Sequence, residues 1–288
     1  MAITHDTGIT QYLSYGTGAT ADTYAGRVIS GNLFGDPNRV WRPSIGGKHA
    51  AARNAPVRLG GTATIEVADA TLIGYFSRSS YTKPAMNALT FEGGLAGDNN
   101  TGWTQTGCYI NSIEARMSVG EPLVCTIEWV ATDEAAQGTP AAQDEMAAHF
   151  EWFEGTSTLN GTTYGLQSLT VRGSNNLEAL TTIETKGSNV KVLPQDFKVG
   201  KETIEISAEM LARPTSNTLW DIHDDVDLSG MSAILSATAV GSAATITFTL
   251  ANLAGGAHRM PFEADDGTVV FTLDMAAEPN ASDSLAIT

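Results

Sequence analysis

The chain has 288 residues, of which 42% are hydrophobic, and its 32 acidic residues against 16 basic ones give a net charge of −16. This length accommodates two domains of ordinary size, and 29 glycines suit a turn-rich β protein. A surface this acidic repels nucleic acid and therefore disfavours stable DNA binding. The first ten residues carry neither a basic region nor an apolar stretch, so no secretory signal is predicted there.

Residues 16–21, GTGATA, fit the loose glycine pattern of a dinucleotide-binding loop with alanine in the third place. That loop works only between a strand and a helix of a parallel βαβ unit. No parallel-sheet pattern follows, so we interpret residues 16–21 as a turn.

Residues 27–61 carry six basic residues and one acid, Asp36, among several prolines and glycines. The composition predicts a long basic arm or loop, and loops of this length are usually functional or ordered by a partner. It could be a solvated loop, bind phosphate or dock on an acidic neighbour. Phosphate binding is disfavoured because Trp41 is the only aromatic residue between Arg39 and Arg58.

Charge complementarity favours docking between copies of the chain. Residues 1–150 hold 9 basic and 14 acidic residues, whereas residues 151–288 hold 7 and 18, so the second half is the more acidic. In a homopolymer this difference steers one subunit onto the next. The candidate contact residues between copies are Arg39, Arg42, Lys48, Arg53 and Arg58.

Alternation of apolar and polar residues is the main periodicity of the first half. It predicts a strand over 62–67 and a hairpin over 113–129, each with one buried face. Between them, Asp69 can cap a short helix that turns Leu72, Ile73 and Phe76 to one face.

The two cysteines, Cys108 and Cys125, are predicted to be free and buried. A turn at 119–122 places Cys125 opposite about residue 115, which leaves an offset of roughly 20 Å from Cys108 along the strand. This offset is too long for a disulfide within the hairpin.

The second half repeats these signals. We predict a strand at 203–206, a helix capped by Asn217, a hairpin over 234–250, a glycine-rich loop over 252–268 and a last strand over 268–275. Residues 228–257 carry no charge, but Ser, Thr, Gly and Asn interrupt them throughout, so a hairpin is favoured over a membrane helix.

Four aspartates surround His223, and clustered carboxylates can hold a hard cation such as calcium. The candidate ligands are Asp221, Asp224 and Asp225, but the cluster lacks the glycine-bearing loop that calcium sites favour, so solvated acids are the preferred interpretation. No HExxH, CxxC or GxSxG motif occurs. We therefore predict no enzymatic activity and no cofactor.

The order of elements indicates an internal duplication. Thr64–Val67 matches Thr203–Ile206, and the hairpin 113–129 matches 234–250. The predicted fold is mainly β, with two tandem antiparallel β-sandwich or barrel domains, each with one flanking helix, and the long N-terminal arm. The first domain spans 1–135 and includes the arm, 136–148 is a linker, and the second domain spans 149–288. Duplications of this kind are commoner in assemblies than in enzymes.

Three passages resemble the tail tube proteins, or major tail proteins, of siphovirus-like bacteriophages and archaeal tailed viruses. They are 53–76 (RNAPVRLGGTATIEVADATLIGYF), 153–177 (FEGTSTLNGTTYGLQSLTVRGSNNL) and 201–211 (KETIEISAEML). With the two hairpins they cover about two-thirds of the chain. They are patterns of small and apolar residues, so the resemblance rests on their order and on the duplication.

The resemblance implies two tandem tail-tube domains in each subunit and homotrimeric rings with six-fold pseudosymmetry. Such rings stack into a long non-contractile tube in the virion tail, assembled in the host cytoplasm, that conducts genomic DNA without binding it specifically and does not insert into membranes. The implied partners are further copies of the chain, the tape-measure protein and the tail-completion or baseplate proteins.

Two alternative functions remain open. One is a two-domain adhesin or carbohydrate-binding module of a virion or cell surface that uses Trp103, Trp152 and Trp220. The other is a β-sandwich hydrolase with the 221–227 cluster as its site.

Overall fold

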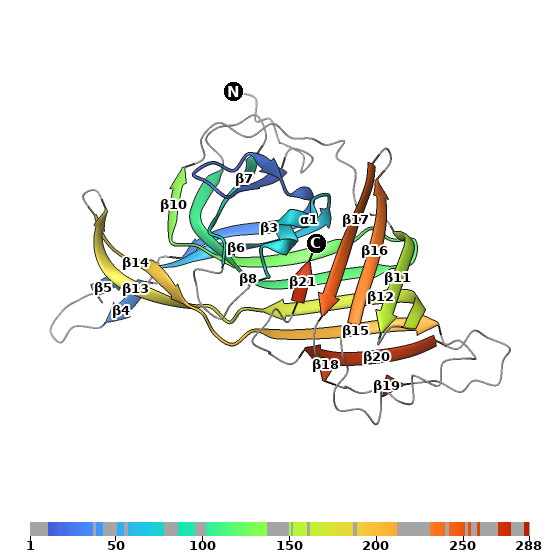
Figure 1. Ribbon diagram of the computed structural model, residues 1–288. Helices are drawn as coiled ribbons and strands as arrows, with labels where there is room; N and C mark the ends of the chain where they lie inside the picture. Colours follow the sequence, from blue (N-terminus) through green and yellow to red (C-terminus); the bar gives the residue numbers. More distant parts are fainter. Residues whose placement is uncertain are drawn as a thin grey trace.

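The structure is a computed structural model that describes residues 11–36, 39–42, 51–54, 57–77, 86–95, 102–136, 150, 152–159, 162–186, 189–211, 231–239, 242–250, 253–254, 258–259, 270–277 and 285–287. These ranges form antiparallel strands and one short helix, which confirms the mainly β prediction (Figure 1). Within them, no helix has the length and apolar character needed to span a membrane.

The first half of the chain contributes ten strands and the helix. Their bounds are β1 (Gln11–Gly16), β2 (Thr23–Tyr24), β3 (Gly26–Asp36), β4 (Arg39–Arg42), β5 (Ala51–Asn54), β6 (Arg58–Val67), α1 (Ala70–Gly74), β7 (Leu89–Leu95), β8 (Trp103–Ser118), β9 (Val124–Val130) and β10 (Asp133–Ala136).

The second half contributes strands alone within the described ranges. Their bounds are β11 (Trp152–Leu159), β12 (Thr162–Ser174), β13 (Glu178–Lys186), β14 (Asn189–Lys198), β15 (Thr203–Leu211), β16 (Met231–Ala239), β17 (Ser242–Leu250), β18 (Leu253–Ala254), β19 (His258–Arg259), β20 (Val270–Ala277) and β21 (Leu285–Ile287).

One continuous sheet runs through both halves in the order β3–β6–β9–β8–β12–β15–β20, and the short strands β18 and β19 pair with the outer edge of β20. We call it the central sheet. A second layer lies on one of its faces: β1, β7 and the first part of β8 over the first half, and β11, β16 and β17 over the second (Figure 1). The hydrophobic core lies between the layers and includes residues from both halves.

The predicted alternation of buried and exposed side chains is confirmed. Ala63, Ile65 and Val67 of β6 are buried, as are Cys125, Ile127 and Trp129 of β9. The first hairpin has the predicted register, with Ala115 opposite Cys125, and both cysteines are free and buried. The second hairpin is β16–β17, in which Ala239 pairs with Ser242.

The helix and the first turn also form as predicted. The Asp69 carboxylate accepts a hydrogen bond from the Thr71 amide at 2.8 Å, and Leu72, Ile73 and Phe76 are fully buried. Residues 16–21 connect β1 to β2, which pairs back on β1, so they form a turn between antiparallel strands. The predicted helix at Asn217 lies outside the described residues.

The pattern of strand pairing repeats in the two halves. Four strand pairs of the first half have counterparts in the second. The pair β1–β7 corresponds to β11–β16, β3–β6 to β12–β15, β6–β9 to β15–β20, and β7–β8 to β16–β17. Both β3 and β12 contain one extra residue near their start, Ile29 and Gln167, where the pairing register shifts. These two bulges align the halves residue by residue.

The positions of the two bulges correct both matches between the halves that the sequence suggested. Thr64 pairs with Ser30 just past the first bulge, and Glu209 pairs with Ser168 just past the second, so Thr64 corresponds to Glu209 and not to Thr203. The hairpin β16–β17 corresponds to β7–β8 and not to β8–β9. All half-buried strands share the same alternation, so a match of patterns does not identify which strand is which.

The described residues of the segment 27–61 form a β-arm and not an irregular loop. Its ends belong to β3 and β6, which pair along their length in the central sheet, and β4 and β5 continue outward as a two-stranded ribbon. The glycines that suggested a loop make room for a core side chain. A Cβ atom on Gly61 would lie 2.2 Å from the ring of Trp129, so β6 needs glycine at this crossing.

Candidate assembly surfaces

The two halves are joined edge to edge by β8 and β12. Seven residue pairs, from Ser118–Ser168 to Ser112–Ser174, form this internal joint. The Arg172 guanidinium contacts the Glu114 carboxylate at 2.9 Å, and the amide of Val119 donates to the carbonyl of the bulge residue Gln167 at 3.0 Å. The bulge therefore sets the register of the joint as well as that of its own half.

Asn175 locks the end of the joint. Its Nδ2 donates to the carbonyls of Phe76 at 3.2 Å and Ile110 at 3.0 Å, and its own amide donates to the Asn111 carbonyl at 2.7 Å. The side chain is fully buried. Phe76 also covers Gly173, where a Cβ atom would lie 2.4 Å from the ring. The first half thus closes the edge of β12 with backbone pairing, a buried amide and an aromatic ring.

The central sheet is not closed, and β3 forms one of its ends. Within the described residues, β3 pairs with β6 on one side and with no strand on the other. The bulge residue Ile29 is 55% exposed, and Val28 and Leu33 are only partly buried. The opposite end of the sheet is formed by β18 and β19.

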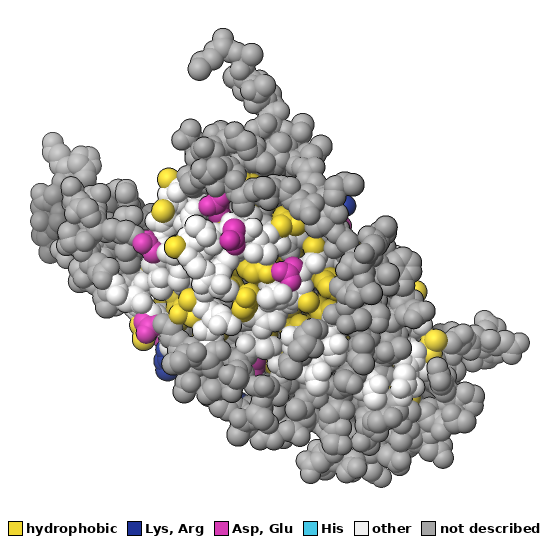
Figure 2. All heavy atoms as spheres, turned by 45° about the horizontal axis from the view of Figure 1, so that its top comes forward, with side chains coloured by type: hydrophobic (Ala, Val, Ile, Leu, Met, Phe, Trp, Pro, Cys, Tyr) yellow, Lys and Arg dark blue, Asp and Glu magenta, His cyan; other side chains and the backbone are white. Residues whose placement is uncertain are grey.

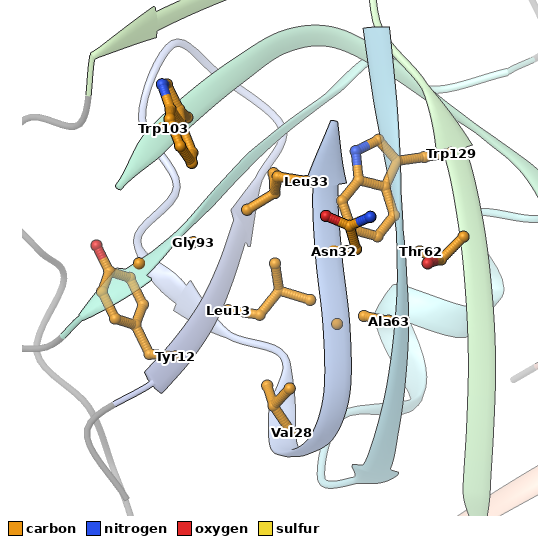
Figure 3. Close-up of a pocket in the computed structure, with 12 residues that line it drawn as sticks. Tyr12, Leu13, Val28, Asn32, Leu33, Thr62, Ala63, Gly93, Trp103 and Trp129 are labelled. Carbon is orange, nitrogen blue, oxygen red and sulfur yellow. The ribbon is translucent and has the colours of Figure 1, made fainter. Parts of the chain in front are cut away.

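An apolar pocket of about 310 Å³ opens beside β3, between the central sheet and the layer of β1 and β7 (Figure 3). Val28 and Leu33 of β3 line it together with Leu13, Trp103 and Trp129. Trp103 is 55% exposed. Figure 2 shows hydrophobic side chains open to the surface among acidic ones on the face that it presents. The open edge is therefore apolar beside its unpaired backbone.

The other face of the central sheet, which no described strand or helix covers, is polar and acidic. We call it the polar face. Among the described side chains, its strands contribute mostly Ser and Thr, six acids and four arginines; the charged residues are Arg27, Arg58, Glu66, Glu114, Arg116, Glu128, Arg172, Glu205, Glu209 and Asp274. Hydrogen bonds tie the carboxylates to neighbouring strands, as from Ser112 to Glu128 at 3.0 Å and from Ser207 to Asp274 at 2.6 Å.

The candidate stacking residues fall on the β-arm. Arg39 pairs with Asn54 and Arg53 with Val40 in the β4–β5 ribbon, and Arg42 ends β4. Arg58 begins β6 opposite Asp36 and is exposed. Lys48 lies outside the described residues. A second ribbon, β13–β14, leaves the corresponding end of β12, and Figure 1 shows the two ribbons at the same end of the sheet.

The buried acid of the first half is used within the fold. Tyr12 donates to one oxygen of Glu92 at 2.8 Å, and Thr104 donates to the other at 3.0 Å. Burial and the neighbouring Glu92 raise the pKa of Tyr12, so its phenol stays a neutral donor. The Tyr15 phenol contacts Asp69 in the same way. These bonds hold strands and the helix cap together.

The described residues contain no group of three metal-ligating side chains. The candidate ligands Asp221, Asp224 and Asp225 lie outside the described ranges. Of the three tryptophans that a sugar-binding module would use, Trp103 is exposed, Trp220 lies outside the described residues, and only the backbone of Trp152 is described.

Sequence reasoning missed the open edge of β3 and the lock at Asn175. The glycines of β3 and β6 concealed a strand pair, although the hydrophobic residues around Gly31 were a usable signal. Residues 174–176 gave no such signal, because a buried asparagine cannot be told from a turn asparagine without the neighbouring strand.

Comparison with known proteins bears on the whole chain. Residues 8–283 match the family model described as "Phage tail tube protein". No curated protein sequence matches the chain. Because the match spans nearly its full length, the chain belongs to the phage tail tube protein family, whose members are non-enzymatic structural components of the virion tail that assemble into a tube.

Proposed function

We propose that the chain is a tandem-domain tube subunit of a long non-contractile, siphovirus-like tail. Residues 1–135 and 149–288 form two equivalent tube domains, and 136–148 connect them. Three chains close into a ring of six domains. The observation that carries this proposal is the internal joint, in which two halves with the same strand pairing already share one sheet through β8 and β12.

Ring closure gives the open sheet the partners that it lacks. An unpaired strand edge templates association unless it is covered, and a closed barrel removes edges altogether. Within the part of the chain that the structure describes, the central sheet has open ends at β3 and at β18–β19. Repetition of the internal joint between chains would pair both ends.

The polar face is the surface available to line the tube, because the second layer covers the other face. Its six acids outnumber its four arginines, so it repels the DNA backbone and lets DNA pass without binding. Reversing Glu205, Glu209 and Asp274 to lysine should leave tubes that retain double-stranded DNA at low salt. Thr163→Lys on β12 is the control, because it adds a single positive charge without replacing an acid of the polar face. Triple-variant tubes that retain no DNA would refute this role.

The β-arm supplies the contact between stacked rings. Its basic residues Arg39, Arg42, Lys48, Arg53 and Arg58 would meet the more acidic second half of a subunit in the next ring. Deleting residues 39–54 leaves a five-residue connection between β3 and β6, a length that hairpins accept. We expect single rings that do not stack. Tubes of normal length from this variant would contradict the arm's role.

Electron microscopy of the purified protein in negative stain, over a series of concentrations, tests the proposal as a whole. We expect rings or hollow tubes with a six-fold outline, and native mass spectrometry of single rings should give three chains. In the virion, the tape-measure protein would occupy the lumen, and tail-completion and baseplate proteins would cap the ends after assembly in the host cytoplasm. Monomers under every condition would refute the proposal.

A further inference from the structure

The two halves can be aligned at the far end of the central sheet as well as at its start. Trp129 pairs with Gly61, and Met275 pairs with Ile206, which is the corresponding residue of β15. On the other side of β20, His258 pairs with Leu273 and Arg259 with Thr272. In the first half, Ile113 and Glu114 of β8 hold the corresponding pairs, with Ile127 and Thr126. β19 therefore stands where the joint-forming part of β8 stands.

The same alignment identifies the counterpart of β12. In the internal joint, Gly173 pairs with Ile113 and Arg172 with Glu114. Counting from the two bulges, Gly173 corresponds to Gly35 and Arg172 to Phe34. Glycine is kept at the first of these positions.

From this correspondence, and resting on the proposed ring, we infer that the open edge of β3 binds the β19 edge of a second copy in the register of the internal joint. Gly35 lies opposite His258 of that copy, and Phe34 lies opposite Arg259. The strands run antiparallel, as β12 and β8 do.

The chemistry of the open edge fits this partner. Arg172 meets an acid inside the chain, whereas Phe34 replaces the arginine and Arg259 replaces the acid. A guanidinium against an aromatic face is a favourable pair. The second copy would also cover Val28, Ile29 and the pocket beside Trp103, which are apolar and incompletely buried. The partner is a copy of this chain, because the chain carries both edges of the joint.

Single-cysteine variants test the register. Directly opposed residues of an antiparallel pair have Cα atoms about 4.5–5.5 Å apart, a separation that a disulfide spans. Cys108 and Cys125 give little background, because burial raises the pKa of each thiol to about 12. We expect an oxidised mixture of Phe34→Cys and Arg259→Cys to form covalent heterodimers, and each variant alone to form none. A variant that carries both Phe34→Cys and Arg259→Cys should give covalent species of up to three chains and none larger.

Two controls accompany the mixture. Glu114→Cys with Arg172→Cys in one chain should form the disulfide of the internal joint. His258→Cys mixed with Phe34→Cys is one residue out of register, so the two thiols fall on opposite faces and cross-linking should drop at least tenfold.

The outcomes separate the register from the proposed ring. Rings or tubes that form without the Phe34–Arg259 cross-link overturn the register and leave the ring proposal standing. Self-cross-linking of Phe34→Cys alone would show a two-fold interface between β3 edges and overturn the head-to-tail arrangement. Protein that stays monomeric by electron microscopy and mass spectrometry overturns both.

Discussion

β12 and β3 occupy equivalent places in the two halves and differ in what lies on their outer edge. Leu166, Leu169 and Val171 of β12 are at most 2% exposed. Their counterparts in β3 are Val28 and Leu33, which are partly buried, and Gly31, which is exposed. β8 covers β12, and within the described residues no strand covers β3. The burial of these side chains therefore depends on the strand next to them, and the first half leaves that place open.

The largest expected effect comes from replacing the residues at one strand crossing by their counterparts in the other half. Gly61 passes beneath Trp129, whereas Ile206 passes beneath Met275 at the corresponding crossing. Gly61→Ile forces a side chain into the Trp129 ring and should lower the free energy of unfolding by more than about 3 kcal/mol. Adding Trp129→Met should recover most of that loss. Urea unfolding of the three proteins measures it.

The recovery will be incomplete, because Trp129 also donates to Gln105 at 2.8 Å and stacks on Phe91 at 4.3 Å between ring centroids. Trp129→Met alone is the matched control. A double variant no more stable than Gly61→Ile would show that the two crossings are not equivalent and would break the alignment of the halves.

Alanine placed at one equivalent position should have opposite effects in the two halves. Leu169→Ala removes a buried side chain of β12 and should cost about 3 kcal/mol. Gly31→Ala adds a Cβ atom whose nearest neighbours lie at 3.5 Å or beyond, so it should be neutral or stabilise by about 0.5 kcal/mol. Thermal unfolding of both variants measures the contrast. Equal destabilisation would mean that β3 is as tightly covered as β12.

Much of the fold follows from the sequence, because local signals specify local structure. Asp69 precedes an apolar helical spacing, and the turn at 119–122 sets the register of β9 against β8. The pairing between halves does not follow, because it depends on strands far apart in the sequence that share one pattern. Gly61 illustrates the limit: its glycine indicates a loop until Trp129, on a strand 68 positions later, is placed against it.

Asn175 tests the internal joint against the open edge. Asn175→Ala leaves the buried carbonyls of Phe76 and Ile110 without their donor and should cost about 2 kcal/mol. Asn32→Ala, at an exposed position of β3, should change stability by less than about 0.5 kcal/mol. Chemical denaturation at neutral pH measures both. If the two changes were equal, Asn175 would not lock the joint.

The smallest effect concerns the ion pair that the open edge lacks. Although burial by itself would raise it, the pKa of Glu114 is lowered by the hydrogen bonds and charges of Arg116 and Arg172. A lowered folded-state pKa adds stability above the ordinary glutamate pKa of about 4.3, and that stability is lost as the pH falls through the folded-state value. Arg116 and Arg172 are 62% and 55% exposed, so solvent screens the pair and Glu114→Gln should cost less than about 1 kcal/mol at pH 7.

The cost of Glu114→Gln should disappear as the pH falls through the lowered folded-state pKa of the wild-type carboxylate, and it should shrink in molar salt. The difference in unfolding free energy between wild type and variant at each pH isolates this carboxylate from the others that titrate with it. A cost that stays constant as the pH falls from neutral into the acid range would mean that Glu114 acts through its packing. The internal joint would then depend on backbone pairing and Asn175 alone. In that case, the lack of a carboxylate at Arg259, the position of β19 that corresponds to Glu114, would not weaken the contact between copies electrostatically.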